Sequence, residues 1–358
     1  MKRLDPWLLL SVVAIAAASF LAQSSTAQAL ENPAFAYRQL LWLSVAMGLT
    51  VVVGMMDYRV LARFWPFFYV ATLAVLAITL VVAPVRAGTR SWLVIGSFTV
   101  QPSEFARVVV ILTLAAAASA HQEARLSLKK AAELAFLTAV PVGLVLLQPD
   151  LGVALTFLPP LLAIYFVAGL RRLVWAFLLV LAVALSAVAF VAFLKPYQKE
   201  RILTFLQPER APYASGYQQR QAKIAVGSGG LSGKGLKSGT QSQLRFLPAQ
   251  RTDFIFAVWA EETGLFGSLL LLAAYAVLLY RVFAAGLAAR DRLGLLLAAG
   301  VGAVLAIQVL VNVGMNVGLA PTTGITLPLL SYGGSSVLAT GLSLGLVQSV
   351  WRLRFANV

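Results

Sequence analysis

Residues 293–317 read LGLLLAAGVGAVLAIQVLVNVGMNV, a run of 25 residues without one charged side chain. A helix needs about 20 apolar residues to cross the hydrocarbon core of a bilayer, and comparable runs recur along the whole chain. Hydrophobic residues make up 60% of the 358 positions and charged residues only 11%, whereas a soluble domain has about 25% charged residues. The sequence therefore predicts an all-α polytopic membrane protein.

Ten segments are expected to span the membrane, which gives about ten transmembrane helices in a single membrane domain over residues 1–358. These segments are residues 6–22, 37–56, 64–84, 102–120, 131–148, 151–169, 173–193, 253–280, 293–317 and 333–351. One large extracytoplasmic loop, residues 194–252, is expected to carry short amphipathic helices on the outer leaflet. Four prolines, at 141, 149, 159 and 160, predict kinked or broken helices between residues 131 and 169.

The basic residues predict the orientation of the chain. They gather in alternate connections, and the positive-inside rule then places both termini in the cytoplasm. The large loop is basic as well, but long loops are translocated largely regardless of charge. The first 29 residues resemble a secretory signal. Their apolar part is long and further spans follow, so an uncleaved first helix is expected.

Composition excludes several kinds of function. The net charge of +15 does not indicate nucleic-acid binding, because Lys and Arg fall between hydrophobic runs and not along one soluble face. The chain has no cysteine and one histidine, His121, in the polar stretch HQEARLSLKK. Disulfides, thiol nucleophiles and Cys/His zinc sites are therefore excluded. The chemistry must rest on carboxylates, Lys or Arg, hydroxyls or a hard cation held by oxygen.

Three acids stand where an apolar run begins, in RTDFIFAVWAEETG at residues 251–264. On a helix, Glu261 lies about 80° around from Asp253 and roughly 12 Å deeper, while Glu262 faces away from Asp253. The three acids therefore do not form one cluster on a single helix. Capping of the helix by Asp253 or Thr252 is the structural alternative to a chemical role for Asp253. The glutamates are expected to be structural, with Arg or backbone amides of another span as partners.

The stretch VQPSEFAR at residues 100–107 places another acid at the start of a span. Pro102 suits the first turn of a helix, where Glu104 is favoured by the helix dipole. Arg107 follows three residues later, so the two side chains can pair on one helix face. Because charges within spans are costly, the pair is either a local ion pair or a polar floor under an outward-facing cavity.

The glycine-rich stretch AVGSGGLSGKGLKSG at residues 225–239 does not match the Walker pattern. Ser228 stands where that pattern needs its first glycine, and Gly235 follows Lys234. Backbone amides together with Lys234 and Lys237 can cradle a pyrophosphate. A flexible surface loop is the alternative.

A second irregular stretch, GLAPTTGITLPLLSYGGSS at residues 318–336, breaks the helices at membrane depth. Non-helical backbone is tolerated there only when it is buried in protein or lines a wet cavity. This stretch therefore indicates a site.

Five stretches, in this order, resemble the SEDS family (shape, elongation, division, sporulation). They are GTRSWLVIGSFTVQPSEFAR from Gly88, QPDLG from Gln148, GYQQRQAKIAVGSGGLSGKGL from Gly216, LPAQRTDFIFAVWAEETGLFG from Leu247 and NVGLAPTTGITLPLLSYGGSS from Asn316. The resemblance covers nearly the whole chain. The short N-terminus and compact loops look most similar to the rod-shape branch of the family and less like its division branch.

The resemblance implies ten transmembrane helices and a peptidoglycan glycosyltransferase. Such an enzyme polymerises lipid II into glycan strands at the outer face of the cytoplasmic (inner) membrane, here for cell elongation and rod shape. It implies a class B penicillin-binding protein and the elongation machinery as partners, and no nucleic acid.

The resemblance also implies site residues. The family's essential acid maps to Asp253 and its QPSE glutamate to Glu104. Many members have Lys where this chain has Arg107, so the charge is kept but lysine-specific chemistry is not supported there. Substrate-binding residues are further expected at Arg90, Trp92, Gln101, Ser103, Asp150, Lys234, Asn312 and Ser331, all of which except Asn312 lie in the five stretches.

This family chemistry suits a carboxylate at the outer edge of the membrane. Asp253 is expected to act as the general base that takes a proton from the acceptor sugar hydroxyl. The pyrophosphate leaving group needs positive charge, either from loop Lys and Arg or from a divalent cation, Mg²⁺ or Mn²⁺, on carboxylate oxygens. The residues do not choose between these sources.

Three rival functions remain open from the sequence. A lipid II flippase or transporter also suits buried polar residues and broken helices. A scaffold that only docks a partner would not depend on Asp253. A polymerase of the division branch would share the chemistry and differ in its cellular role.

Overall fold

The computed structural model describes residues 3–85, 88–96, 98–120, 125–188, 199, 203, 205 and 215–355. Helices dominate, as predicted, and the only strands among these residues form one short antiparallel hairpin. It pairs β1 (Leu93–Ile95) with β2 (Phe98–Val100), with Leu93 opposite Val100. His121 and much of the 194–214 part of the predicted loop lie outside the described residues.

Each of the ten predicted spans contains helix within the described part of the chain. The helices are α1 (Pro6–Ala29), α2 (Ala34–Met55), α3 (Tyr58–Arg63), α4 (Trp65–Val82), α5 (Pro102–Ser119), α6 (Leu128–Leu147), α7 (Leu151–Leu155), α8 (Leu158–Val167), α9 (Arg172–Val188), α11 (Ser215–Ser228), α12 (Thr240–Gln243), α13 (Ile255–Leu287), α14 (Arg292–Val317) and α15 (Gly334–Leu353). Among the described residues, seven helices are long and apolar enough to cross a membrane: α1, α2, α4, α5, α6, α13 and α14. The count of ten spanning helices stays a prediction.

Two predicted spans are interrupted. The segment predicted at 151–169 is divided into α7 and α8, and Pro159 and Pro160 lie in the first turn of α8, where a missing N–H costs little. The segment predicted at 253–280 begins at Ile255 and bends at Gly264, whose φ of 67° and ψ of −163° are not helical. Glycine adopts that conformation without the clash a Cβ would cause. The first part of α13 is therefore a separate short helical segment.

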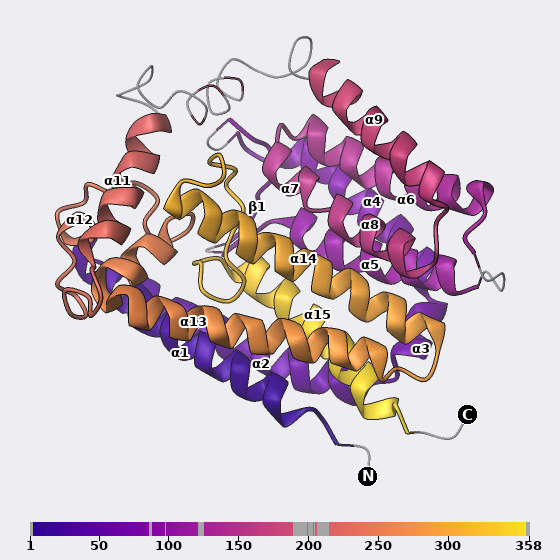
Figure 1. The fold of residues 1–358 in the computed structure, drawn as a ribbon, viewed down its shortest axis with the longest axis horizontal. Coiled ribbons are helices and arrows are strands. Elements are labelled where there is room, and N and C mark those ends of the chain that lie inside the picture. The colour runs from indigo at the N-terminus through magenta and orange to yellow at the C-terminus, as the bar shows by residue number, and fades with distance from the viewer. Residues whose placement is uncertain are drawn as a thin grey trace.

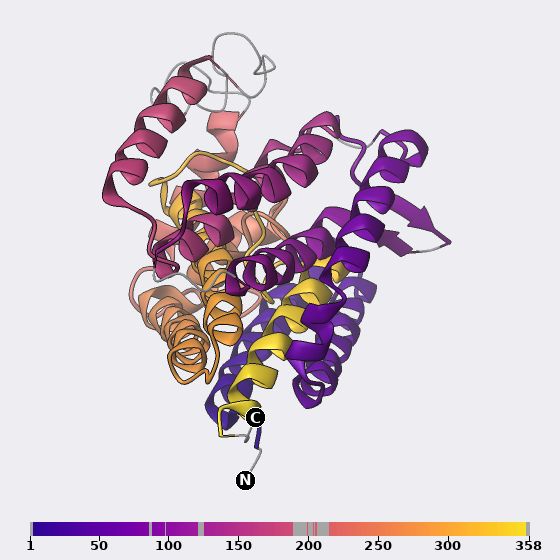
Figure 2. The same cartoon turned by 90° about the vertical axis from the view of Figure 1, so that its right-hand side faces the viewer.

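The helices pack as one bundle in which α1 lies beside α13, α2 lies against α15, and α14 contacts α5, α8 and α13 (Figure 1). A methyl group at Gly341 of α15 would lie only 2.6 Å from the carbonyl oxygen of Ala46 in α2, so this contact depends on a small residue. Both termini lie at one end of the bundle, while α11 and α12 lie at the other (Figures 1 and 2). α1 packs against α13 and α2 and is an integral part of the bundle.

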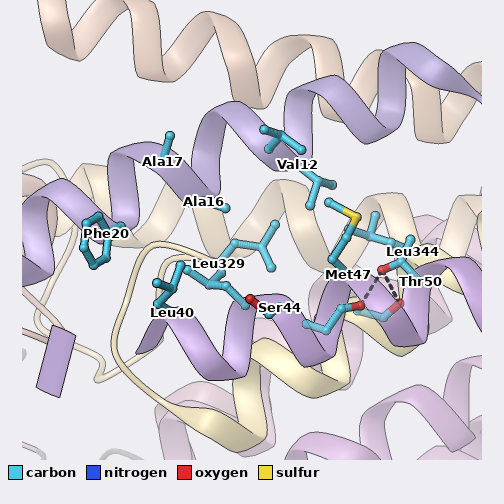
Figure 3. Close-up of a pocket in the computed structure, with 14 residues that line it drawn as sticks. Val12, Ala16, Ala17, Phe20, Leu40, Ser44, Met47, Thr50, Leu329 and Leu344 are labelled. Atoms are coloured by element: carbon cyan, nitrogen blue, oxygen red, sulfur yellow. Dashed lines mark hydrogen bonds between the residues drawn. The ribbon is translucent and has the colours of Figure 1, made fainter. Parts of the chain in front are cut away.

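An apolar groove of about 500 Å³ runs between α1 and α2 and is floored by α15 and Leu329 (Figure 3). Its only hydroxyl-bearing lining residues are Ser44 and Thr50, and the Thr50 hydroxyl contacts the carbonyl oxygens of Ala46 and Gly341 at 2.9 and 3.0 Å. No charged side chain of the described residues lines the groove. It is therefore a hydrophobic groove.

Candidate active site

Asp253 lies in a tight turn immediately before α13. The amides of Thr252, Asp253 and Phe254 all donate to the carbonyl oxygen of Ala249, at 3.1 to 3.3 Å. The helix starts at Ile255, and its N-cap residue, Phe254, makes no side-chain capping hydrogen bond. The alternative in which Asp253 or Thr252 caps the helix is therefore wrong, because the turn ends before the helix begins and leaves the Asp253 side chain outside the first turn.

Three consecutive carbonyl groups of this turn are held by distant parts of the chain. The Asp253 oxygen accepts hydrogen bonds from the side-chain amides of Asn312 at 3.2 Å and Asn316 at 3.1 Å. The Thr252 oxygen accepts from the Ser331 hydroxyl at 2.6 Å. The Arg251 oxygen accepts from the Gln23 side chain at 3.0 Å and from the Tyr332 amide at 2.8 Å. The backbone below the Asp253 carboxylate is thus fixed by α1, α14 and the 318–333 segment.

The Asp253 side chain is half-buried beside the 318–333 segment. A Cβ at Gly324 would lie 3.9 Å from Asp253 Oδ2, and Gly324 has a φ of 75°, which favours glycine. Thr323, the residue before Gly324, lies against α7. Its carbonyl oxygen would be only 2.2 Å from a Cβ at Gly152 of α7. The segment therefore brings the carboxylate of Asp253 and the start of α7 to the same region of the bundle.

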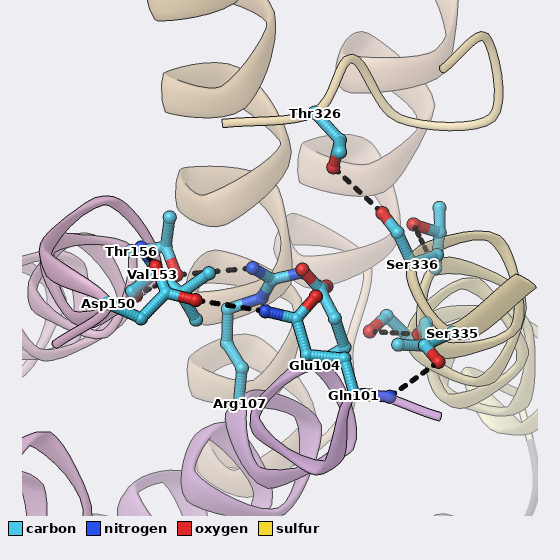
Figure 4. A network of polar contacts seen from close by, with 12 residues as sticks. Gln101, Glu104, Arg107, Asp150, Val153, Thr156, Thr326, Ser335 and Ser336 are labelled. Carbon is cyan, nitrogen blue, oxygen red and sulfur yellow. Dashed lines mark hydrogen bonds and ion pairs between the residues drawn. The ribbon is translucent and has the colours of Figure 1, made fainter. Parts of the chain in front are cut away.

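A polar network joins the starts of α5, α7 and α15 (Figure 4). Arg107 Nη2 contacts Glu104 Oε2 at 2.6 Å, and both residues are 4% exposed. This confirms the ion pair predicted from their spacing. Arg107 Nη1 also donates to the Thr156 hydroxyl at 3.1 Å. The backbone N–H of Gln101 donates to the Ser335 hydroxyl at 2.9 Å, and the Gln101 side-chain Nε2 donates to Asp150 Oδ2 at 3.1 Å.

Asp150 connects this network to α7. Its Oδ1 accepts the amide of Val153 at 3.2 Å and so caps the helix, while its Oδ2 accepts from Gln101. Burial raises the pKa of the Asp150 carboxyl above its ordinary value, and the nearby charge of Glu104 adds to this. The bonds from Val153 and Gln101 act in the opposite direction, because they stabilise the ionised form.

Glu261 organises the glycine-rich loop. It is fully buried, and it accepts hydrogen bonds from Lys234 Nζ at 2.8 Å, the Gln241 amide at 2.9 Å and the Ser242 amide at 3.3 Å. Glu262 accepts a hydrogen bond from the Ser25 hydroxyl of α1. The glutamates are occupied by structural partners, as expected, but Glu261 meets a loop and not another span.

The eight sequence-predicted substrate residues fall into four groups. Gln101 and Asp150 join the network described above. Asn312 and Ser331 are buried and bonded to backbone carbonyls, so they position Asp253. Lys234 is paired with Glu261 and with the Thr240 hydroxyl at 2.7 Å.

The remaining predicted residues lie around the hairpin and the start of α5. Arg90 is exposed and its amide donates to the Gln148 carbonyl oxygen at 3.2 Å. Trp92 is half-buried, and the Ser103 hydroxyl is buried without a partner among the described residues. Asn316 is a positioning residue that was not predicted. Its place one turn after Asn312, in a helix with few polar side chains, was the available signal.

No group of three or more His, Cys, Asp or Glu side chains in the described part of the chain is arranged to hold a metal ion. Mg²⁺ is commonly held by one or two carboxylates together with substrate phosphates. The single carboxylate of Asp253 fits that shared kind of site and does not fit an all-protein cage.

Comparison with known proteins places this geometry in context. A family model described as "Cell cycle protein", for the FtsW, RodA and SpoVE proteins, matches residues 3–354. The chain is 35% identical to the probable peptidoglycan glycosyltransferase FtsW of Coxiella burnetii, over 97% of this chain and 95% of that protein. It is 38% identical to the peptidoglycan glycosyltransferase MrdB of Escherichia coli K12, over 86% of this chain and 83% of that protein.

Solved structures show the same similarity. One is a chain from a peptidoglycan synthase complex that coordinates polymerization and crosslinking, with a TM-score of 0.83, 37% identity and 99% of both chains covered. Another is the rod shape determining protein RodA of Thermus thermophilus, with a TM-score of 0.75, 35% identity and 99% of both chains covered.

Proposed function

This chain belongs to the FtsW/RodA/SpoVE family of cell cycle proteins, and from that membership we propose that it polymerises lipid II into glycan strands. It is a peptidoglycan glycosyltransferase of the SEDS family. The observation that carries the assignment to particular residues is the half-buried carboxylate of Asp253 on a backbone held by Asn312, Asn316 and Ser331. A catalytic group needs such a fixed support to keep its geometry.

In the proposed reaction Asp253 is the general base. Its carboxylate accepts the proton of the acceptor sugar hydroxyl as that oxygen bonds to the anomeric carbon of the donor. The bond from the anomeric carbon to the pyrophosphate oxygen breaks, and the lipid pyrophosphate leaves from the opposite face, with inversion. The Glu104–Arg107 pair and the Gln101–Asp150 contact form a polar wall near the start of α7.

Two sources can supply the positive charge that the pyrophosphate leaving group needs. One is a basic side chain of the protein: Lys234 is already paired with Glu261, whereas Arg90 is exposed. A divalent cation, Mg²⁺ or Mn²⁺, held by Asp253 and the pyrophosphate oxygens would supply the same charge stabilisation. Omitting and restoring each cation in a polymerisation assay distinguishes the two sources.

The cellular role that we propose is elongation. MrdB is among the similar proteins, RodA is among the similar structures, and the short N-terminus and compact loops look most similar to the rod-shape branch. We place the chain in the cytoplasmic membrane with both termini inside, following the distribution of basic residues. A class B penicillin-binding protein is the proposed partner, because a similar structure comes from a complex that joins polymerization to crosslinking. Rescue of rod shape in cells depleted of the elongation polymerase, but not of septation in cells depleted of the division polymerase, tests this role.

The enzyme, transporter and scaffold functions are separated by reconstitution. Purified protein and partner are placed in liposomes that carry labelled lipid II. An enzyme produces glycan strands. A transporter moves the label across the bilayer without polymer, and a scaffold does neither. Movement of lipid II without polymer would contradict the proposed function.

A further inference from the structure

A polar pocket lies at the far end of α5 from the candidate active site. It has a volume of about 440 Å³ and is walled by α3, the start of α4, the end of α5, Asp291 and the start of α14. The 18 residues of α5 rise by about 27 Å, close to the ~30 Å thickness of a hydrocarbon core. The pocket therefore lies at the opposite membrane interface from Asp253.

The pocket is positively charged. Three arginines and one aspartate line it, which leaves a formal charge of +2 among the lining residues. Asp291 is engaged by the protein: its carboxylate accepts hydrogen bonds from the Tyr58 hydroxyl, from Arg59 Nε and from the Gly294 amide, each at 2.7 Å. Because Arg59 offsets this acid, the excess charge comes from Arg63 and Arg292.

Two of the guanidinium groups have unmet hydrogen-bonding capacity. Arg63 is exposed, and no described residue pairs with its side chain. Arg59 Nη2 is buried and has no acceptor among the described residues, although nearly all buried polar groups have one. Guanidinium groups match phosphate oxygens well, because their parallel N–H groups bind two oxygens at once. The pocket thus has the donors and the charge for a phosphate.

The border of the pocket is aromatic and apolar. Half-buried Trp65 lines it, and the adjacent Phe64 and Phe67 are 58% and 69% exposed. Tryptophan is enriched at membrane interfaces, and basic pockets there attract anionic lipid headgroups. We propose that this pocket binds the phosphodiester of an anionic phospholipid, whose acyl chains lie along the exposed apolar side chains of α3 and α4.

The lipid is preferred to a free phosphate because the aromatic border adjoins the arginines and contributes only to a ligand with acyl chains. The inference requires only that the bundle spans a bilayer. That the pocket faces the inner leaflet follows from the orientation proposed above.

The test follows the melting temperature of the purified protein in detergent during titration with phosphatidylglycerol, phosphatidylcholine or inorganic phosphate. Arg63→Gln removes an exposed cation of the pocket. Arg171→Gln is the matched control, because Arg171 is also exposed, directly precedes α9 and does not line the pocket. Neither substitution removes a described side-chain contact, so both variants should fold.

We expect phosphatidylglycerol to raise the melting temperature of wild type and Arg171→Gln alike, and phosphatidylcholine to have no comparable effect. Arg63→Gln should bind phosphatidylglycerol about fivefold more weakly, as expected for one interfacial arginine. Equal weakening in both variants would show unspecific surface attraction and overturn the proposal. An equal shift by inorganic phosphate at the same concentration would also overturn it, in favour of a free-anion site. The readout needs no lipid II, so it is independent of the proposed enzyme function.

Discussion

The side-chain amide of Asn316 donates a hydrogen bond to the carbonyl oxygen of Asp253 at 3.1 Å, across 63 positions of sequence. The same side chain accepts the amide of Ala257 at 3.1 Å, and so supplies the cap that the first turn of α13 lacks locally. One buried amide of α14 therefore fixes both the turn that carries the acid and the helix that follows it.

Replacing Asn316 should displace the Asp253 carboxylate without changing Asp253 itself. Asn316→Ala leaves the Asp253 carbonyl with one donor fewer and the Ala257 amide with only the Phe254 carbonyl oxygen as acceptor, at a cost of about 0.5–1.5 kcal/mol for each hydrogen bond lost. We expect a lower melting temperature and a polymerisation rate reduced about ten- to a hundredfold, because small displacements of a catalytic group are costly. Asn32→Ala, at an exposed asparagine between α1 and α2, is the matched control. An Asn316→Ala protein that melts and polymerises like wild type would contradict this prediction.

The Glu104–Arg107 pair should behave as one buried unit. Arg107→Met leaves the Glu104 carboxylate buried without its partner, which destabilises proteins by about 3–5 kcal/mol. Adding Glu104→Gln removes the stranded charge, so the double variant should melt higher than Arg107→Met alone. Arg107→Lys keeps the charge and loses only the contact to Thr156, so its effect should be small. Additive effects of the two single substitutions would show that the side chains do not interact.

Lys234 should act through Glu261 and not through the substrate. Glu261→Ala removes the acceptor of one ammonium and of two backbone amides, whereas Lys234→Ala leaves the other donors in place. We therefore expect a larger fall in melting temperature for Glu261→Ala, with activity following stability in both variants. Direct binding of pyrophosphate by Lys234 would instead appear as a raised KM at an unchanged melting temperature.

Asp150 should give the stability of the protein a pH dependence. Its pKa is raised by burial, so the folded state holds this proton more tightly than the unfolded state does. The stabilising contribution is complete below the ordinary value of about 3.8–3.9 and is lost as the pH rises through the raised pKa. Asp150→Asn can still cap α7 and removes this titration. The variant should gain melting temperature relative to wild type as the pH is raised upward from about 4. Parallel curves for the two proteins would contradict the assignment.

Local pattern was enough to predict the helical segments and one contact of the site. Uncharged apolar runs predict helices in a bilayer because the backbone has no other partner there. The Glu104–Arg107 pair follows from a spacing of three residues on one helix. Each of these two features depends on residues of one helix only, so it can be predicted from the local sequence.

The remaining features depend on contacts between distant elements. Asp253 is not the helix cap because Asn316, 59 residues after Ala257, performs that role. Glu261 meets a loop because α13 bends at Gly264, and one glycine within an apolar run gives no sign of a bend. Lys234 lies in a glycine-rich loop that was predicted to bind pyrophosphate, yet its ammonium group pairs with the buried carboxylate of Glu261.

The most direct test of the account is polymerisation of lipid II by the purified protein with its partner, compared between wild type and Asp253→Asn. The substitution preserves the shape of the side chain and the carbonyl bonds to Asn312 and Asn316, and removes the charged carboxylate that takes a proton or holds a cation. Glu31→Gln, at an acid that is 84% exposed and paired at the surface with Arg245, is the matched control. The account predicts glycan strands from wild type and Glu31→Gln, none from Asp253→Asn, and equal melting temperatures and lipid II binding for all three. Glycan strands from Asp253→Asn at the wild-type rate would contradict it.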